Sequence, residues 1–223
     1  MFDINNYLQN LITACISAFA DRLLYVGLQG SYLRGEANAE SDIDVMIVID
    51  GLIVRDMDVY REILQQVGDY ERSCGFICGK DEILRWNPLE VCQLKYTTKD
   101  LYGTLSAFLP ESSRADEINY VKLSLGNLYH ELCHRYIHAD LEKNKNRFRS
   151  ACKGFFYLIQ NLYYLESGTF IATKRELKTV VCDDDRMMLA MSELPDDFDF
   201  GKAFDFVFAW CQTAFRRIDG IKP

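Results

Sequence analysis

Residues 27–50 read GLQGSYLRGEANAESDIDVMIVID and contain two features that decide the fold. A glycine-serine pair, Gly30 and Ser31, follows a short apolar run and indicates a turn after a strand. Two aspartates, Asp42 and Asp44, stand at the head of a run of branched apolar residues, which is typical of a central strand covered on both faces. Side chains two residues apart on a strand point to the same side, so the two carboxylates are expected to converge on one cation.

Paired aspartates at a strand start indicate a magnesium site beside phosphate. Mg²⁺ takes oxygen ligands and bridges protein carboxylates to substrate phosphates. Gly30 lets the backbone approach a phosphate, and Ser31, at the start of an expected helix, offers a hydroxyl beside amide hydrogens that favour anions. Gly35 is expected to relieve crowding before the loop into Ser41. The alternative, a turn followed by solvated acids, is disfavoured because acids entering an apolar strand are costly without a cation.

The first half of the chain is predicted to be mixed α/β. Helical spacing of apolar residues is found in the first 20 residues and again over 56–67, where Gly68 follows. Short apolar or alternating runs predict strands at 23–29, 43–49, 74–78 and 89–98, and a short helix is expected at 80–86.

The second half is predicted to be helical. After Pro110 the strand-like alternation is lost, and long helical patterns follow at roughly 116–139, 146–166, 174–190 and 201–218. The fold class expected is therefore α+β: a mixed sheet with flanking helices in residues 1–110, followed by an α-helical bundle in residues 111–223.

Composition limits the partners and the compartment. A chain of 223 residues that is 49% hydrophobic is long enough to bury one large core or two smaller ones. Its net charge of -8 argues against binding extended nucleic acid, which needs clustered lysine and arginine. No apolar run is long enough to cross a membrane as a helix. Eight cysteines lie mostly in apolar segments and the amino terminus does not read as a signal peptide, so reduced thiols and a cytoplasmic location are expected.

The stretch from Gly30 to Asp44 resembles a known superfamily. A Gly-Ser pair, a second glycine and a Ser-Asp-Ile-Asp strand start are typical of the nucleotidyltransferases that include DNA polymerase beta and the aminoglycoside nucleotidyltransferases. The resemblance implies that Asp42 and Asp44 bind Mg²⁺ and are catalytic. It also implies that four residues of this stretch contact a nucleoside triphosphate, ATP being the expected donor: Gly30, Ser31, Arg34 and Ser41.

A third carboxylate is expected from the same resemblance, on a neighbouring strand, as a metal ligand or as the base. The candidate is Glu90, because Leu-Glu-Val at the start of the strand predicted at 89–98 resembles the streptomycin and spectinomycin adenylyltransferases. The opposing interpretation is a surface acid beside Pro88. Four other acids are weaker candidates: Asp69, Glu71, Asp81 and Glu82.

The resemblance implies an enzyme that moves a nucleoside monophosphate, most simply AMP from ATP, to a hydroxyl of a small acceptor such as an antibiotic. In similar enzymes a helical second domain completes the acceptor cleft. Two alternatives stay open: a protein-modifying or toxin-neutralising nucleotidyltransferase, and a nucleotide-binding module without activity. The acceptor and the oligomeric state are left open, a homodimer being one option.

A rival motif occurs in the second half, where residues 130–134 read HELCH and fit the zinc-protease pattern His-Glu-x-x-His. A third histidine, His138, follows on the same expected helix, and the extended zinc-protease spacing is missing. We therefore interpret these histidines as core or boundary residues of a long helix and keep a zinc hydrolase as a remote alternative.

Overall fold

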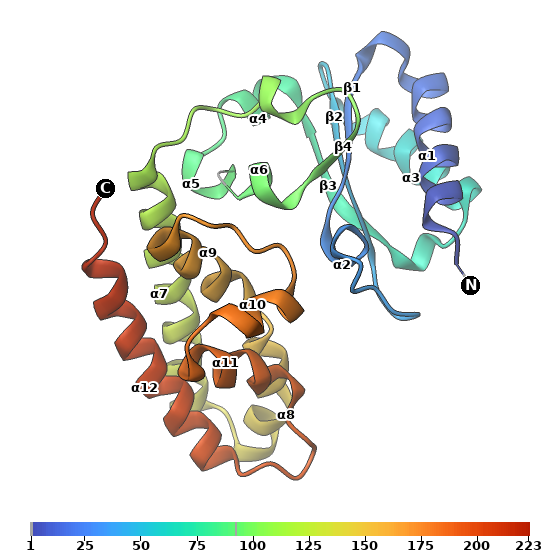
Figure 1. Cartoon of the computed structure of the whole chain (residues 1–223). Helices are drawn as coiled ribbons and strands as arrows, with labels where there is room; N and C mark the ends of the chain where they lie inside the picture. Colours follow the sequence, from blue (N-terminus) through green and yellow to red (C-terminus); the bar gives the residue numbers. More distant parts are fainter. Residues whose placement is uncertain (1, 92) are drawn as a thin grey trace. The chain divides into compact units, whose positions relative to one another are not determined.

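The computed structural model describes residues 2–91 and 93–223. The chain divides into two compact units, Met1–Glu111 and Ser112–Pro223 (Figure 1).

The first unit is built on a four-stranded mixed sheet of order β3-β2-β1-β4. Strands β1 (Leu23–Leu28) and β2 (Ile43–Ile49) are antiparallel, and β4 (Lys99–Tyr102) pairs antiparallel to the other side of β1. Strand β3 (Ser73–Gly79) pairs parallel to β2. The sheet places the start of β2 between the end of β1 and the start of β3.

The two faces of this sheet are covered by different helices (Figure 1). One face packs against α1 (Ile4–Phe19) and α3 (Val54–Val67) through residues such as Val45 and Ile47. The other face carries Met46 and Val48, which pack with Ile83 of α4 (Lys80–Leu84). Because side chains alternate along β2, Asp44 belongs to this second face.

Three short helices complete the first unit. A five-residue helix, α2 (Gly30–Arg34), joins β1 to the loop before β2. The segment between β3 and β4 forms α4 (Lys80–Leu84), α5 (Pro88–Val91) and α6 (Leu94–Thr97).

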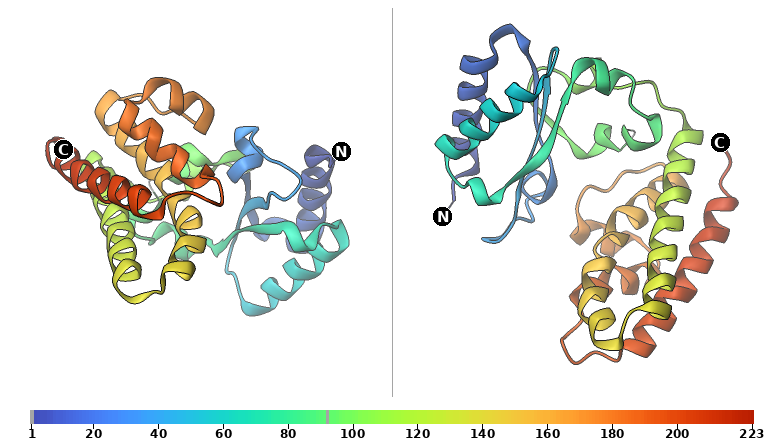
Figure 2. Two further views of the ribbon diagram at one scale, coloured as in Figure 1. Left: turned by 90° about the horizontal axis from the view of Figure 1, so that it is seen from below. Right: turned by 180° about the vertical axis from the view of Figure 1, so that it is seen from behind.

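The second unit is helical throughout its described residues. Its elements are α7 (Arg114–His138), α8 (Leu141–Cys152), α9 (Phe155–Ser167), α10 (Lys174–Val180), α11 (Asp183–Ala190) and α12 (Phe200–Asp219). The long helices α7 and α12 run antiparallel side by side (Figure 2). Aromatic side chains join them: Tyr129 stacks on Phe208 and Tyr136 on Phe204. Helix α9 is apolar on most of its surface and lies within the core.

The predicted fold class is confirmed. The strand predicted at 43–49 is β2, and the helices expected at the amino terminus and over 56–67 are α1 and α3. Two long helices expected in the second half are each divided into two, α8 with α9 and α10 with α11. Among the helices of the described residues, none is both long and apolar enough to span a membrane.

A buried ionic network stabilises the second unit. The Asp185 carboxylate accepts a hydrogen bond from Trp210 Nε1 at 2.7 Å and two from Arg217, at 2.8 and 2.9 Å. Arg217 also pairs with Glu166 at 2.8 Å. Asp185 is only 1% exposed, so its charge depends on these donors.

We expect Asp185→Ala to lower the free energy of unfolding of the second unit by about 2–3 kcal/mol, because it removes the acceptor of the buried Trp210 indole N–H and one of the two carboxylates that pair with the partly buried Arg217. The measurement is urea unfolding followed by Trp210 fluorescence in a Trp86→Phe background, since Trp86 belongs to the first unit. The neighbouring Asp184 is exposed and provides the control, Asp184→Ala. Equal unfolding midpoints for the two variants would contradict this role.

Candidate active site

The turn between β1 and α2 is built around Gly30. This residue has φ +67°, in the left-handed region that glycine adopts without strain. The preceding residue, Gln29, donates its backbone N–H to the Asp44 carbonyl at 2.9 Å. A Cβ added to Gly30 would lie 1.9 Å from Asp44 Oδ2. The glycine is therefore needed here for two reasons, its backbone conformation and the space that it leaves for the Asp44 side chain.

Asp44 is a half-buried carboxylate. Its pKa is raised above the ordinary value mainly by burial, and the negative charge of Asp42 raises it further. A hydrogen bond with the Cys74 thiol and the positive charge of Arg34 act in the opposite direction. Bringing a second carboxylate close to a partly desolvated one is unfavourable unless a cation is shared.

The aspartate pair fits a magnesium ion. Mg²⁺ is bound in proteins through one or two carboxylates, with waters and substrate phosphates completing its shell. Within residues 2–91 and 93–223, no group of three or more histidine, cysteine, aspartate or glutamate side chains is arranged to hold a metal. Two carboxylates without a third protein ligand are compatible with a metal whose remaining ligands are waters and substrate phosphates.

The other residues expected at this site belong to α2 and to the turn before β2. Ser31 is the second residue of α2, which begins at Gly30 as the sequence indicates. Arg34 ends the same helix, and its Nε lies 3.0 Å from Glu36 Oε2. Ser41 is fixed in a tight turn, where its Oγ accepts the backbone N–H of Asn38 at 2.9 Å.

The prediction of a strand at 89–98 is wrong. Residues 88–91 and 94–97 are the helices α5 and α6, and the strand comes later, as β4. Glu90 is consequently an exposed helix residue whose Oε2 accepts the indole N–H of Trp86 at 2.5 Å. The argument from a strand start therefore fails, but α5 packs through Val91 in the cluster that contains Met46 and Val48, on the sheet face of Asp44, and the role of Glu90 as a third carboxylate stays a prediction.

Strand β3, next to β2, and strand β4, on the far side of β1, carry residues that the sequence did not reveal. On β3, Cys74 lies directly opposite Asp44. On β4, Asp100 lies opposite Gly27, on the same face of the sheet as Asp44. Asp100 accepts the Tyr25 hydroxyl at 2.7 Å. The sequence signal for Asp100 is an acid in a short β-prone segment after Thr97 and Thr98. It was not recognised, because the predicted strand was placed at 89–98 and ended before Asp100.

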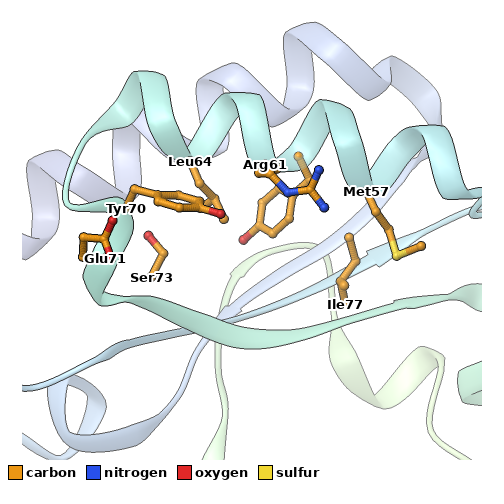
Figure 3. Close-up of a pocket in the computed structure, with 8 residues that line it drawn as sticks. Met57, Arg61, Leu64, Tyr70, Glu71, Ser73 and Ile77 are labelled. Carbon is orange, nitrogen blue, oxygen red and sulfur yellow. The ribbon is translucent and has the colours of Figure 1, made fainter.

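The pocket between α3 and β3 belongs to the opposite face of the sheet (Figure 3). It has a volume of about 360 Å³, and Ser73 and Ile77 of β3 form its floor. Residues of β3 alternate between faces, so Cys74 points to the aspartates while Ser73 and Ile77 point away from them. This pocket is not part of the candidate site.

The HELCH motif lies on α7, where the imidazole centroids of His134 and His138 are 4.7 Å apart. Glu131, the residue that a zinc hydrolase would use as its base, forms an ion pair with Arg135 at 2.8 Å. No described set of three ligands is completed here. The absence of bound zinc stays a prediction, tested by elemental analysis of the purified chain.

The position of Cys74 opposite Asp44 allows a direct test of whether a magnesium nucleotide binds at Asp44. Cys74 is exposed, so a reagent can reach it. Partial desolvation of its thiol and the charge of Asp44 raise its pKa, which slows its reaction. We expect a magnesium complex of a non-hydrolysable ATP analogue to slow its alkylation by N-ethylmaleimide at pH 8. Cys182, which is exposed in the second unit, is the internal control. Peptide mass spectrometry that finds equal labelling of Cys74 with and without the complex would contradict binding at Asp44.

Comparison with known proteins agrees with this geometry. Residues 10–96 match the model of the nucleotidyltransferase domain family. The fold is similar to the crystal structure of spectinomycin adenyltransferase AAD(9) from Enterococcus faecialis with ATP and spectinomycin. That similarity has a TM-score of 0.58 and 12% identity, and covers 97% of this chain and 100% of that one.

A toxin-antitoxin structure with AMP-PNP is also similar to part of the chain, with 22% identity over 57% of this chain and 92% of that one. Its TM-score of 0.31 is too low to indicate a shared overall fold. No curated protein matches the chain. The family model covers the β1–α2–β2 site described above, and the resemblance inferred from the sequence is confirmed. Residues 10–96, which lie in the first unit, therefore match a nucleotidyltransferase domain, the family that the sequence pattern resembles.

Proposed function

We propose that this enzyme transfers the nucleoside monophosphate of a nucleoside triphosphate, with ATP as the preferred donor, to a hydroxyl group of a small acceptor. The observation that carries the proposal is the placement of the Asp44 carboxylate against the Cβ-free face of Gly30, next to the charge of Asp42. The full-length fold similarity to an adenyltransferase solved with ATP and spectinomycin supports both the donor and the class of acceptor.

Asp42 and Asp44 are the proposed magnesium ligands. When bound, Mg²⁺ neutralises the triphosphate and stabilises the departing pyrophosphate. The glycine at position 30 leaves the backbone at the start of α2 accessible to the triphosphate, and Ser31 and Arg34 of this helix are the proposed contacts. Ser41 holds the turn that precedes Asp42.

The transfer forms a bond between the acceptor oxygen and the α-phosphorus and breaks the bond from that phosphorus to the bridging oxygen of pyrophosphate. The acceptor proton must leave during the step, which requires a base or water. Two acids are candidates for this base: Glu90, on the segment that packs over the sheet face of Asp44, and Asp100, which lies on that face in β4. The hydrogen bond from Tyr25 fixes the orientation of the Asp100 carboxylate.

The test is a transfer assay with ATP, GTP, CTP and UTP, each labelled at the α-phosphate, in the presence of Mg²⁺. Acceptors are spectinomycin, streptomycin, other aminoglycosides and a whole-cell lysate. We expect label from ATP on a small molecule. Labelled protein bands would instead support the protein-modifying alternative, and binding of nucleotide without any transfer would leave a binding module. Absence of both binding and transfer would refute the proposal.

A further inference from the structure

The segment that carries Asp42 has few contacts of its own. Residues 35–42 connect α2 to β2 and are mostly exposed. Two of their hydrogen bonds are local: Glu40 N–H donates to Asn38 Oδ1 at 2.9 Å, and Ser41 N–H donates to the Asn38 carbonyl at 3.2 Å. Such bonds shape the turn without attaching it to the sheet, so they leave the direction of Asp42 undetermined.

Arg72 attaches this segment to the domain. It lies immediately before β3, and its Nε and Nη2 both donate to the carbonyl oxygen of Ser41, at 3.2 and 3.1 Å. The same Nη2 donates to the hydroxyl of Tyr32 in α2. Two donors on one carbonyl fix the peptide that joins Ser41 to Asp42. One guanidinium thus joins the helix at the phosphate side of the site to the loop at its metal side.

The guanidinium is itself held in place. Its carbon lies 4.6 Å from the centre of the Phe2 ring, a cation–π contact, and Phe2 packs edge-to-face on Tyr32 with 5.8 Å between ring centres. Asp69 Oδ1 is 3.4 Å from Nη1. The side chain of Arg72 is only 21% exposed. A lysine cannot reproduce this planar set of donors, so the geometry requires arginine.

We propose that Arg72 is a positioning residue for the metal site: it holds the Ser41–Asp42 peptide so that Asp42 shares its cation with Asp44. The inference rests on the proposed function for its metal, but the ordering of the loop belongs to the protein alone. In this role Arg72 acts through the Ser41 carbonyl and not as a ligand of its own. Its effect appears as metal affinity, because without it the loop must be ordered at the moment of binding.

The experiment compares the native chain with Arg72→Ala and Arg72→Lys. In the metal-free protein we expect faster amide hydrogen exchange in residues 36–42 of both variants. In titrations with Mg²⁺ in the presence of a non-hydrolysable ATP analogue, we expect the affinity for Mg²⁺ to fall about tenfold, equivalent to ~1.4 kcal/mol, and kcat to recover at saturating Mg²⁺. Added guanidinium ion is expected to restore part of the affinity in Arg72→Ala and none in Arg72→Lys, where the lysine side chain fills the site.

Arg61→Ala is the matched control, because Arg61 is an exposed arginine of α3 whose ion pair is with Asp58 of the same helix.

Unchanged loop exchange and unchanged Mg²⁺ affinity in Arg72→Ala would overturn the inference. Circular dichroism shows whether Arg72→Ala is folded. If guanidinium ion fails to restore Mg²⁺ affinity in this variant, the positioning role is contradicted. If the native chain itself has no affinity for Mg²⁺ with nucleotide, the proposed function fails together with the metal role of Arg72. Native affinity that is insensitive to Arg72→Ala refutes Arg72 alone.

Discussion

Asp44→Asn is expected to abolish nucleotidyl transfer while leaving the fold of the first unit intact. The amide has the shape of the carboxylate, so it still fits beside Gly30 and still offers an oxygen to the Cys74 thiol. It lacks the negative charge that holds Mg²⁺, and we expect a loss of at least about 1000-fold in kcat/KM. The metal-free variant should be no less stable than the native protein, because burial and the charge of Asp42 already disfavour the Asp44 carboxylate.

Three measurements check this result: transfer of the α-phosphate label, calorimetric titration of the magnesium complex of an ATP analogue, and thermal unfolding without metal. The control is Asp50→Asn, which removes an exposed aspartate immediately after the other end of β2. It should keep native activity. An Asp44→Asn variant that transfers label at the native rate would exclude Asp44 from the metal site. A variant that is inactive because it is unfolded would contradict the stability part of the prediction.

The sequence predicted the centre of the fold better than its periphery. Residues 43–49 form β2 as expected, because a run of branched residues that is apolar on both faces suits only a covered strand. The segment 89–98 was misassigned because apolar and polar residues alternate there. Asn87 and Pro88 carried the contrary signal: the Asn87 side chain accepts the Leu89 N–H at 3.0 Å, and proline is favoured in the first turn of a helix.

The candidate site likewise has a part that the sequence predicted and a part that it did not. Gly30, Asp42 and Asp44 lie within 15 residues of one another, so local pattern is sufficient to bring them together. Cys74 and Asp100 reach the site through strand pairing, one parallel and one antiparallel, and a single sequence does not contain that pairing. Arg72 acts on the loop across 31 residues of sequence, through a backbone carbonyl that has no side-chain signal.

Gly30→Ala is expected to reduce transfer by about 100-fold or more, the size of effect that a misplacement of about 1 Å produces in an active site. The new methyl group would lie 1.9 Å from Asp44 Oδ2 and 2.8 Å from its Cγ, so the whole carboxylate must rotate away from its position on β2. Alanine at φ +67° also costs about 1–2 kcal/mol of backbone strain. Both effects lower the affinity for the magnesium nucleotide, but only the first acts on Asp44.

Gly35→Ala separates the two effects. Gly35 has φ +68°, so alanine there carries the same backbone strain, yet a Cβ at this position meets nothing within 4 Å. We expect Gly35→Ala to lose similar stability in thermal unfolding and to retain most of its transfer activity and magnesium affinity. The difference between the two variants then measures the displacement of Asp44. Equal activity losses in the two variants would show that backbone strain, and not contact with the Asp44 carboxylate, is the reason for glycine at position 30. The start of α2, and not Asp44, would then be the centre of the site.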